Sequence, residues 1–103
     1  ALHELGEAER RSGRFAAAEA DLRRALEIRE RTLDAKSYYP AVTLAALGDL
    51  YLETRRYGEA ARMYERALVR WDASGRPADA ERAAMARGLG EARRRRQASP
   101  AGG

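Results

Sequence analysis

The segment TLAALGDLYLETRRYGEAARMYERAL, residues 43–68, decides the fold of this chain. Its first half carries one helical stripe, which contains Leu44, Leu47, Leu50 and Tyr51. A second stripe follows after a short connection, and it contains Tyr57, Ala60, Ala61, Tyr64, Ala67, Leu68 and Trp71. Two helices joined by only a few residues can cover both apolar faces only by folding back on each other. The segment therefore predicts an antiparallel helical hairpin.

The same pattern recurs at a constant interval. The pairs Leu5-Gly6, Leu47-Gly48 and Leu89-Gly90 are each separated by 42 positions, which indicates an internal repeat. Each glycine lies inside a predicted helix, where it costs roughly 1 kcal/mol relative to alanine. A compensating contact is needed. We expect the following helix to approach closely at the first two glycines, through the small residues Ala18 and Ala60.

These residues resemble the tetratricopeptide repeat, a helical hairpin with Leu-Gly, Tyr, Ala and aromatic residues at fixed offsets. The matching residues in the second repeat are Leu47, Gly48, Tyr51, Tyr57, Ala60, Tyr64 and Ala67. The first repeat matches at Leu5, Gly6, Gly13, Phe15, Ala18, Leu22 and Ala25, with Glu9 in place of the tyrosine. Leu2 and Leu44 replace the tryptophan that the family often has, and the interval is 42 rather than about 34 residues. The longer interval, the extended second helix and Pro40 before the third helix are most similar to the repeats of the kinesin light chain.

The resemblance implies an all-α fold, an α-solenoid of antiparallel helical hairpins with about two and a half repeats in five helices. We expect a repeat domain over 1–96, followed by a flexible tail over 97–103. The domain would comprise repeat 1 at about 1–39, repeat 2 at about 40–76 and a capping helix at about 77–96. Arg93 takes the place of Tyr51 and gives that last helix the polar outer side that a cap requires. Arg55 takes the place of Gly13, so we expect a left-handed backbone or a slightly different turn there.

Charge and composition limit the function classes. The net charge of +4 equals the charge of the run Arg93 to Arg96, so the rest of the chain is balanced. That run predicts a solvated helix end, with phosphate contact as the alternative. The chain has no cysteine for a disulfide or thiolate, and no apolar stretch that approaches the roughly 20 residues of a membrane span. We expect a cytoplasmic setting, no membrane contact and, because Ala1 already lies in a helical pattern, a piece of a longer protein.

The resemblance also implies a binding groove, because the first helix of each repeat lines the concave face in this family. Residues in register then form three rows, which are Glu7, Asp49 and Glu91; His3, Ala45 and Arg87; and Arg10, Leu52 and Arg94. Val42 adds an apolar contact. The row of carboxylates would attract a basic partner segment, and the alternative is that they are ordinary solvated helix residues. The family's clamp for a peptide C-terminal carboxylate uses Lys and Asn on this face, so the acidic residues here do not support that function.

No set of side chains predicts catalysis. His3 is the one histidine, and without converging carboxylates we expect a surface histidine rather than a metal ligand. We find no nucleophile with a base partner and no phosphate-binding glycine loop, so we expect no cofactor and no enzymatic activity. Tyr38, Tyr39 and Trp71 predict core or inter-repeat packing, with an exposed aromatic contact as the alternative.

The sequence thus predicts a non-enzymatic protein–protein interaction scaffold that binds a peptide or protein segment in the concave groove. One alternative is a structural or self-assembly module of a larger regulatory protein, which stacks on neighbouring repeats or on itself. A further alternative is nucleic-acid contact through the arginine-rich C-terminal helix.

Overall fold

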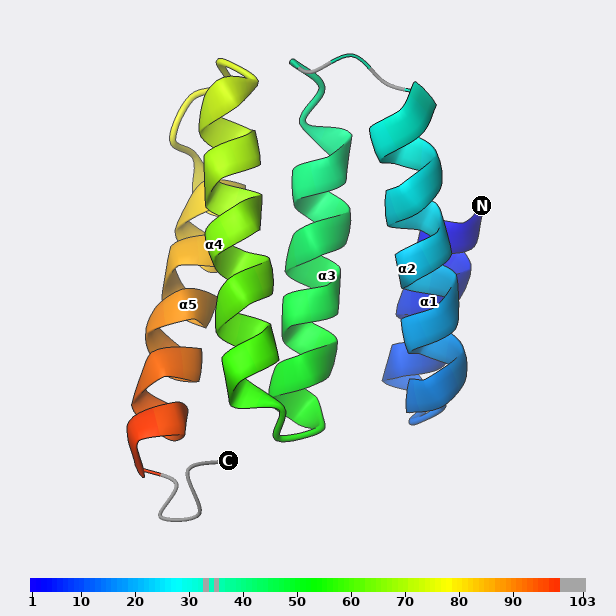
Figure 1. The fold of residues 1–103 in the computed structure, drawn as a ribbon, viewed down its shortest axis with the longest axis vertical. Coiled ribbons are helices and arrows are strands. Elements are labelled where there is room, and N and C mark those ends of the chain that lie inside the picture. The colour runs from blue at the N-terminus through cyan, green and yellow to red at the C-terminus, as the bar shows by residue number, and fades with distance from the viewer. Residues whose placement is uncertain (33, 35, 99–103) are drawn as a thin grey trace.

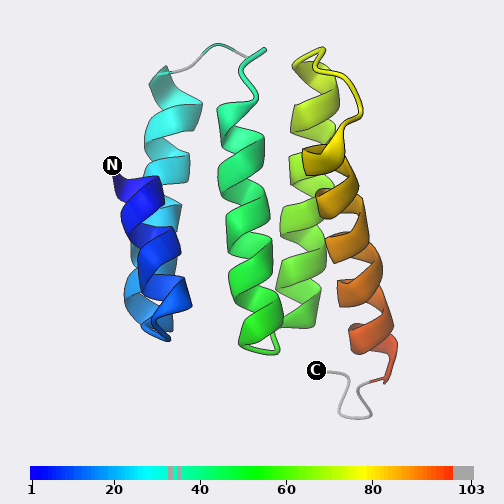
Figure 2. The same cartoon turned by 180° about the vertical axis from the view of Figure 1, so that it is seen from behind.

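The structure is a computed structural model that describes residues 1–32, 34 and 36–98, and within these residues it consists of α-helices. In chain order the helices are α1 (Leu2–Arg11), α2 (Phe15–Thr32), α3 (Tyr39–Glu53), α4 (Tyr57–Ala73) and α5 (Ala80–Ala98). Each helix packs against the next one, and α3 also contacts α1 and α5. Figure 1 shows α2, α3 and α4 side by side, and Figure 2 shows α1, α3 and α5 on the opposite side. The chain is the predicted all-α array of helical hairpins.

The central helix α3 is enclosed by its neighbours. Nine of its 15 residues are buried, whereas α1 buries only Gly6. A helix that is apolar around most of its circumference must be covered on several sides, and α3 has α2 and α4 on its flanks. The predicted stripe is confirmed, because Leu44, Leu47 and Leu50 are at most 2% exposed.

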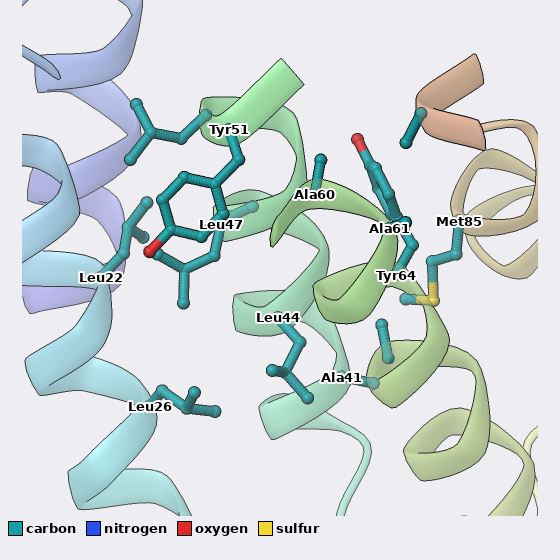
Figure 3. Close-up of a cluster of buried hydrophobic side chains, with 14 of the residues drawn as sticks. Leu22, Leu26, Ala41, Leu44, Leu47, Tyr51, Ala60, Ala61, Tyr64 and Met85 are labelled. Atoms are coloured by element: carbon teal, nitrogen blue, oxygen red, sulfur yellow. The ribbon is translucent and has the colours of Figure 1, made fainter. Parts of the chain in front are cut away.

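Large side chains fill the spaces between the helices (Figure 3). Leu22 and Leu26 extend from α2 toward α3, and Tyr64 of α4 lies close to Met85 of α5. Trp71 is fully buried, and its indole Nε1–H donates a hydrogen bond to the carbonyl oxygen of Pro77 at 3.1 Å. The core therefore runs continuously from α2 through α4 to α5.

The repeated glycines allow close helix approach, but through other residues than predicted. A Cβ added at Gly6 would lie 2.7 Å from Cγ of Leu22, and one at Gly48 would lie 2.8 Å from Cζ of Tyr64. The expected partners Ala18 and Ala60 were therefore wrong by one helical turn. Ala18 and Ala60 are fully buried, but the larger side chain four residues later fills the space over each glycine.

The third repeated glycine lies in a different environment. A Cβ added at Gly90 would meet only Arg94 of its own helix, at 3.4 Å. In α5 it is Gly88 that faces the Tyr64 ring, which thus lies against glycines of two helices, Gly48 of α3 and Gly88 of α5. The close approach of α5 to α4 depends on position 88.

The first helix of each hairpin ends in the same way. Gly13 has φ +81° and Arg55 has φ +63°, which confirms the left-handed arginine. The N–H of Arg14 donates to the carbonyl oxygen of Glu9 at 2.8 Å, and the N–H of Arg56 donates to that of Tyr51 at 2.7 Å. These are the hydrogen bonds of a Schellman motif.

The last helix is displaced from its predicted position. It begins at Ala80 rather than at about 77, because Asp79 caps it: the Asp79 Oδ1 accepts the N–H of Glu81 at 2.9 Å. The helix continues through Gln97 and Ala98, which the sequence had suggested as the start of a flexible tail. The rest of that tail, 99–103, lies outside the described residues. The division into repeats at 1–39, 40–76 and 77–96 stays a prediction.

Candidate functional site

A cavity of about 180 Å³ opens on the face that α1, α3 and α5 form (Figure 2). We call it the α1–α3–α5 cavity. Its polar lining consists of His3, Glu7, Asp49 and Glu81, and its less polar lining consists of Val42, Ala45, Ala46, Tyr64, Ala84 and Met85. The cavity brings together five of the residues predicted for the groove, namely His3, Glu7, Val42, Ala45 and Asp49.

His3 forms a half-buried wall of this cavity rather than the predicted surface histidine. Its Nδ1 lies 3.1 Å from Oγ1 of the buried Thr43, and the Arg29 guanidinium donates to the same Oγ1 at 2.9 Å. Because the Thr43 Oγ1 accepts a hydrogen bond from Arg29, the Thr43 hydroxyl can donate its own proton to the His3 Nδ1. Burial, together with the charge of Arg29, lowers the pKa of His3 below its ordinary value. The neutral form of the His3 ring is therefore favoured in the cavity.

Asp49 is held by Tyr64. The Tyr64 hydroxyl donates a hydrogen bond to Asp49 Oδ1, and the Tyr64 ring is confined by Gly48 and Gly88. Burial raises the pKa of the Asp49 carboxyl above its ordinary value, and the hydrogen bond from Tyr64 opposes that rise. Burial likewise raises the pKa of Tyr64. The carboxylate is thus fixed in place at the junction of three helices.

Glu7 lies beside an arginine at the rim. The Arg10 Nε donates to Glu7 at 3.0 Å, and its NH1 donates to Glu53 of α3. Arg10 therefore links α1 to α3, and it neutralises part of the charge that Glu7 presents.

The third carboxylate of the predicted row lies elsewhere. Glu91 lines a second cavity, of about 230 Å³, together with Leu52, Glu53, Tyr57 and Arg95. Its two carboxylate oxygens accept hydrogen bonds from Arg94 at 2.8 Å and from Arg95 at 3.1 Å. Arg87 is exposed and lines neither cavity. The rows that the 42-residue register predicted across the groove are thus divided between two cavities and the surface.

Glu81 takes the place in the α1–α3–α5 cavity that the prediction gave to Glu91. The reason is that the N-terminal half of α5, with Ala84 and Met85, passes the cavity. Glu81, Ala84, Met85 and Gly88 follow helical spacing, which is a signal that the sequence contained. Sequence reasoning missed it because it placed residues of α5 by the repeat interval alone.

A polar network fixes the two hairpins against each other. The Tyr51 hydroxyl donates to Glu19 Oε2 at 2.7 Å, and Arg56 NH1 donates to Glu19 Oε1 at 2.8 Å. Arg56 also binds Glu59 through two hydrogen bonds of 2.7 Å. Burial alone would raise the pKa of Glu19, but hydrogen bonds from Arg56, Tyr51 and Arg23 outweigh it and lower the pKa to about 2. The network joins α2, α3 and α4.

Tyr38 and Trp71 pack against each other as predicted, whereas Tyr39 does not enter the core. The Tyr38 ring meets the Trp71 ring edge-on with 5.8 Å between centroids, and the Arg76 guanidinium lies 4.0 Å from the Tyr38 centroid. Tyr39 stacks on Tyr38 at 4.4 Å but remains 45% exposed. The cluster ties the α2–α3 connection to the end of α4.

Two kinds of site are not found in the described part of the chain. Within residues 1–32, 34 and 36–98, no three His, Cys, Asp or Glu side chains come together in a way that could hold a metal ion. No helix in the same ranges has the length and apolar character needed to cross a membrane.

Comparison with known proteins identifies the repeat. The family model described as tetratricopeptide repeat matches residues 1–71, which cover the first hairpin and all but the last two residues of α4 in the second. Comparisons with curated proteins and with solved structures gave no match. The likeness to the 42-residue repeats of the kinesin light chain stays a prediction. Tetratricopeptide repeats generally mediate protein–protein interaction and are typically non-enzymatic. Because the match extends over more than half of its residues, the chain belongs to the tetratricopeptide repeat family.

Proposed function

We propose that the chain is a non-enzymatic interaction module that binds a peptide or a segment of a partner protein along α1, α3 and α5. The observation that carries this proposal is the α1–α3–α5 cavity. Its walls are largely small apolar side chains of α3 and α5, and its polar groups come from three helices. An apolar concavity with a few convergent polar groups is the usual composition of a binding site. The general role of the family supports the same conclusion.

The size of the cavity favours a protein segment over a small molecule. Small-molecule sites usually have volumes of roughly 300–1,000 Å³. The α1–α3–α5 cavity has about 180 Å³, which suits one anchoring side chain of a longer segment. The remainder of such a segment would lie along the face that Figure 2 shows.

The test uses a displayed library of random dodecapeptides selected on the whole chain. Ala45→Arg places a long side chain in the cavity, and Ala20→Arg makes the same change at an exposed position of α2. We expect the selected peptides to lose at least tenfold in affinity for the Ala45→Arg variant and to keep their affinity for the Ala20→Arg variant. Circular dichroism checks that both variants are folded. Peptides that bind both variants like the parent chain would contradict the proposal.

A second candidate function rests on the outer face of α1 and α2. Leu5 is 49% exposed and Ile28 is 39% exposed. A cavity of about 240 Å³ lies beside Ile28, and it is lined by Ala1, Leu2, His3, Ala25, Ile28 and Arg29. Helical repeats bury such faces against a neighbouring repeat, so this face would stack on another repeat or on a second copy.

Analytical ultracentrifugation tests the second copy. We expect dimers of the parent chain at high concentration and a monomer for the Leu5→Glu/Ile28→Glu double variant. A parent chain that stays monomeric at high concentration would rule out stacking between copies. A third function, nucleic-acid contact, receives little support from the arginine run. Arg93 pairs with Glu65 at 2.8 Å, and Arg94 and Arg95 pair with Glu91.

A further inference from the structure

The α1–α3–α5 cavity has an excess of negative charge. Three carboxylates line it, one from each first helix of the array: Glu7 from α1, Asp49 from α3 and Glu81 from α5. Its lining contains no arginine or lysine. The chain as a whole has a net charge of +4, so this local charge is opposite to that of the molecule. Outside the run Arg93 to Arg96 the charges of the chain balance, so the cavity has a local excess of carboxylates.

The neighbouring cations neutralise only part of this charge. Arg10 pairs with Glu7 at 3.0 Å, and Arg11 lies 4.0 Å from the same carboxylate. Among the described residues, neither Asp49 nor Glu81 is in an ion pair within 4.0 Å. Asp49 accepts a hydrogen bond from the neutral Tyr64 hydroxyl, and burial lowers the pKa of His3, which disfavours its cationic form. Two carboxylates are thus left facing a largely apolar concavity.

The walls suit the stem of a long side chain. Val42, Ala45, Ala84 and Met85 supply apolar surface next to the carboxylates. Lysine and arginine carry three or four methylene groups below a charged head, and they commonly lay that stem on apolar surface while the head meets a partner. At about 180 Å³ the cavity is smaller than the roughly 300–1,000 Å³ of most small-molecule sites and has room for one such side chain.

We propose, on the basis of the proposed function, that the cavity recognises a lysine or arginine side chain of the bound segment. Its stem lies on Val42, Ala45 and Met85, and its charged head meets Asp49 and Glu81. A neutral apolar side chain would fill the same space and displace water from these carboxylates. It offers no hydrogen bond or charge in return, so its binding costs free energy. An acidic side chain or a C-terminal carboxylate would be repelled. The cavity thus selects a cationic anchor.

The experiment uses the dodecapeptides selected on the parent chain, and it keeps only those whose binding Ala45→Arg abolishes. We expect these peptides to share a lysine or arginine at one position. Replacing that residue with norleucine removes the charge but retains most of the stem. This replacement should lower affinity for the parent chain at least tenfold, as measured by calorimetry or fluorescence anisotropy.

Matched charge variants of the protein complete the test. Asp49→Asn/Glu81→Gln neutralises the two carboxylates that face the cavity, and Asn at 49 retains an acceptor for the Tyr64 hydroxyl. Glu27→Gln/Glu65→Gln removes the same charge from exposed positions of α2 and α4. The first variant should bind the cationic peptide at least tenfold more weakly and should no longer distinguish it from the norleucine peptide. The second variant should behave like the parent chain.

The outcomes separate this inference from the function on which it rests. Peptides whose binding is abolished by Ala45→Arg but that share no lysine or arginine would overturn the cationic anchor and leave groove binding intact. The same holds if replacing the shared cation with norleucine does not weaken binding to the parent chain. Equal losses of peptide affinity in the two charge variants would also overturn the cationic anchor, because they would show only a general effect of net charge. A library that yields no peptide sensitive to Ala45→Arg would overturn the proposed function itself.

Discussion

The hairpins α1–α2 and α3–α4 are built on one sequence pattern, yet they are buried to different degrees. Leu47 of the second hairpin is 1% exposed, whereas Leu5, which is 42 positions earlier, is 49% exposed. The difference lies in the neighbours: α3 is covered by α2 and α4 and also touches α1 and α5, whereas α1 contacts only α2 and α3. The repeat pattern therefore determines the helices and turns, and the position in the array determines how much each residue stabilises the fold.

The largest expected effect compares these two leucines directly. Leu47→Ala removes a fully buried side chain and should lower the free energy of unfolding by roughly 2–5 kcal/mol. Leu5→Ala makes the same chemical change on a half-exposed side chain and should cost less than about 1 kcal/mol. Urea unfolding followed by circular dichroism measures both losses. Equal losses would mean that the position in the array does not control stability.

The next comparison concerns the junctions between elements. Glu19 joins the first hairpin to Tyr51 and Arg56 of the second, with a side chain that is 24% exposed. Glu65 joins α4 to Arg93 of α5 through a pair whose side chains are about half exposed. Glu19→Gln should destabilise the fold at pH 7 by about 2 kcal/mol, because it removes charge-assisted hydrogen bonds to partly buried partners. Glu65→Gln should change stability by less than about 1 kcal/mol.

Acid should remove the contribution of Glu19. Its pKa is lowered to about 2 in the folded chain, so its stabilisation is complete above the ordinary glutamate value of 4.5 and is lost as the pH falls toward 2. From these two values, the parent chain should lose about 2 kcal/mol more between pH 7 and pH 3 than the Glu19→Gln variant. Urea unfolding at both pH values tests this difference. If the parent chain and the Glu19→Gln variant lost the same stability between pH 7 and pH 3, the network would not lower the pKa of Glu19.

Replacing the repeated glycines with alanine should change the stability less, and the sign of the change should differ along the array. Gly48→Ala would place a Cβ 2.8 Å from the Tyr64 ring, which Gly88 and Asp49 prevent from moving away, so we expect a net loss of about 1–2 kcal/mol. Gly6→Ala meets the more adjustable Leu22 side chain and should cost less. Gly90→Ala meets only Arg94 and should stabilise α5 by about 0.5–1 kcal/mol through helix propensity. If Gly90→Ala destabilised the fold as much as Gly48→Ala, Gly90 would not lie in open surroundings.

Residues within one repeat could be predicted from the sequence, because helical spacing and turn chemistry are local. The buried stripe around Leu47 and the left-handed Arg55 are examples. Contacts between helices, within a repeat as well as between repeats, were less accessible, because they depend on how the helices cross. The side chain that packs over Gly48 is that of Tyr64 rather than that of Ala60, since a large side chain reaches a full turn along its helix.

The candidate site shows the same limit. His3, Glu7 and Asp49 line one cavity, because Glu7 and Asp49 occupy equivalent places on α1 and α3 and His3 lies one turn before Glu7. That they bind a partner stays a prediction. Glu81 was missed, because its presence depends on which half of α5 passes α3. The lowered pKa of His3 was also inaccessible, since it follows from burial and from the charge of Arg29. The repeat interval alone predicts neither the place of Glu81 in the cavity nor the pKa of His3.

The smallest expected effect isolates the backbone at the two equivalent turns. A Cβ added at Gly13 would meet nothing within 4 Å, so any cost of Gly13→Arg must come from its left-handed φ of +81° rather than from a clash. We expect that change to destabilise the first hairpin by about 1 kcal/mol. Arg55→Gly relieves the same strain in the second hairpin, but glycine adds freedom to the unfolded chain, so the net gain should be only about 0.5 kcal/mol. Urea unfolding of the two variants and of the double exchange measures these values. A double variant whose change in stability differs from the sum of the two single changes would show that the two Schellman turns are coupled through the array.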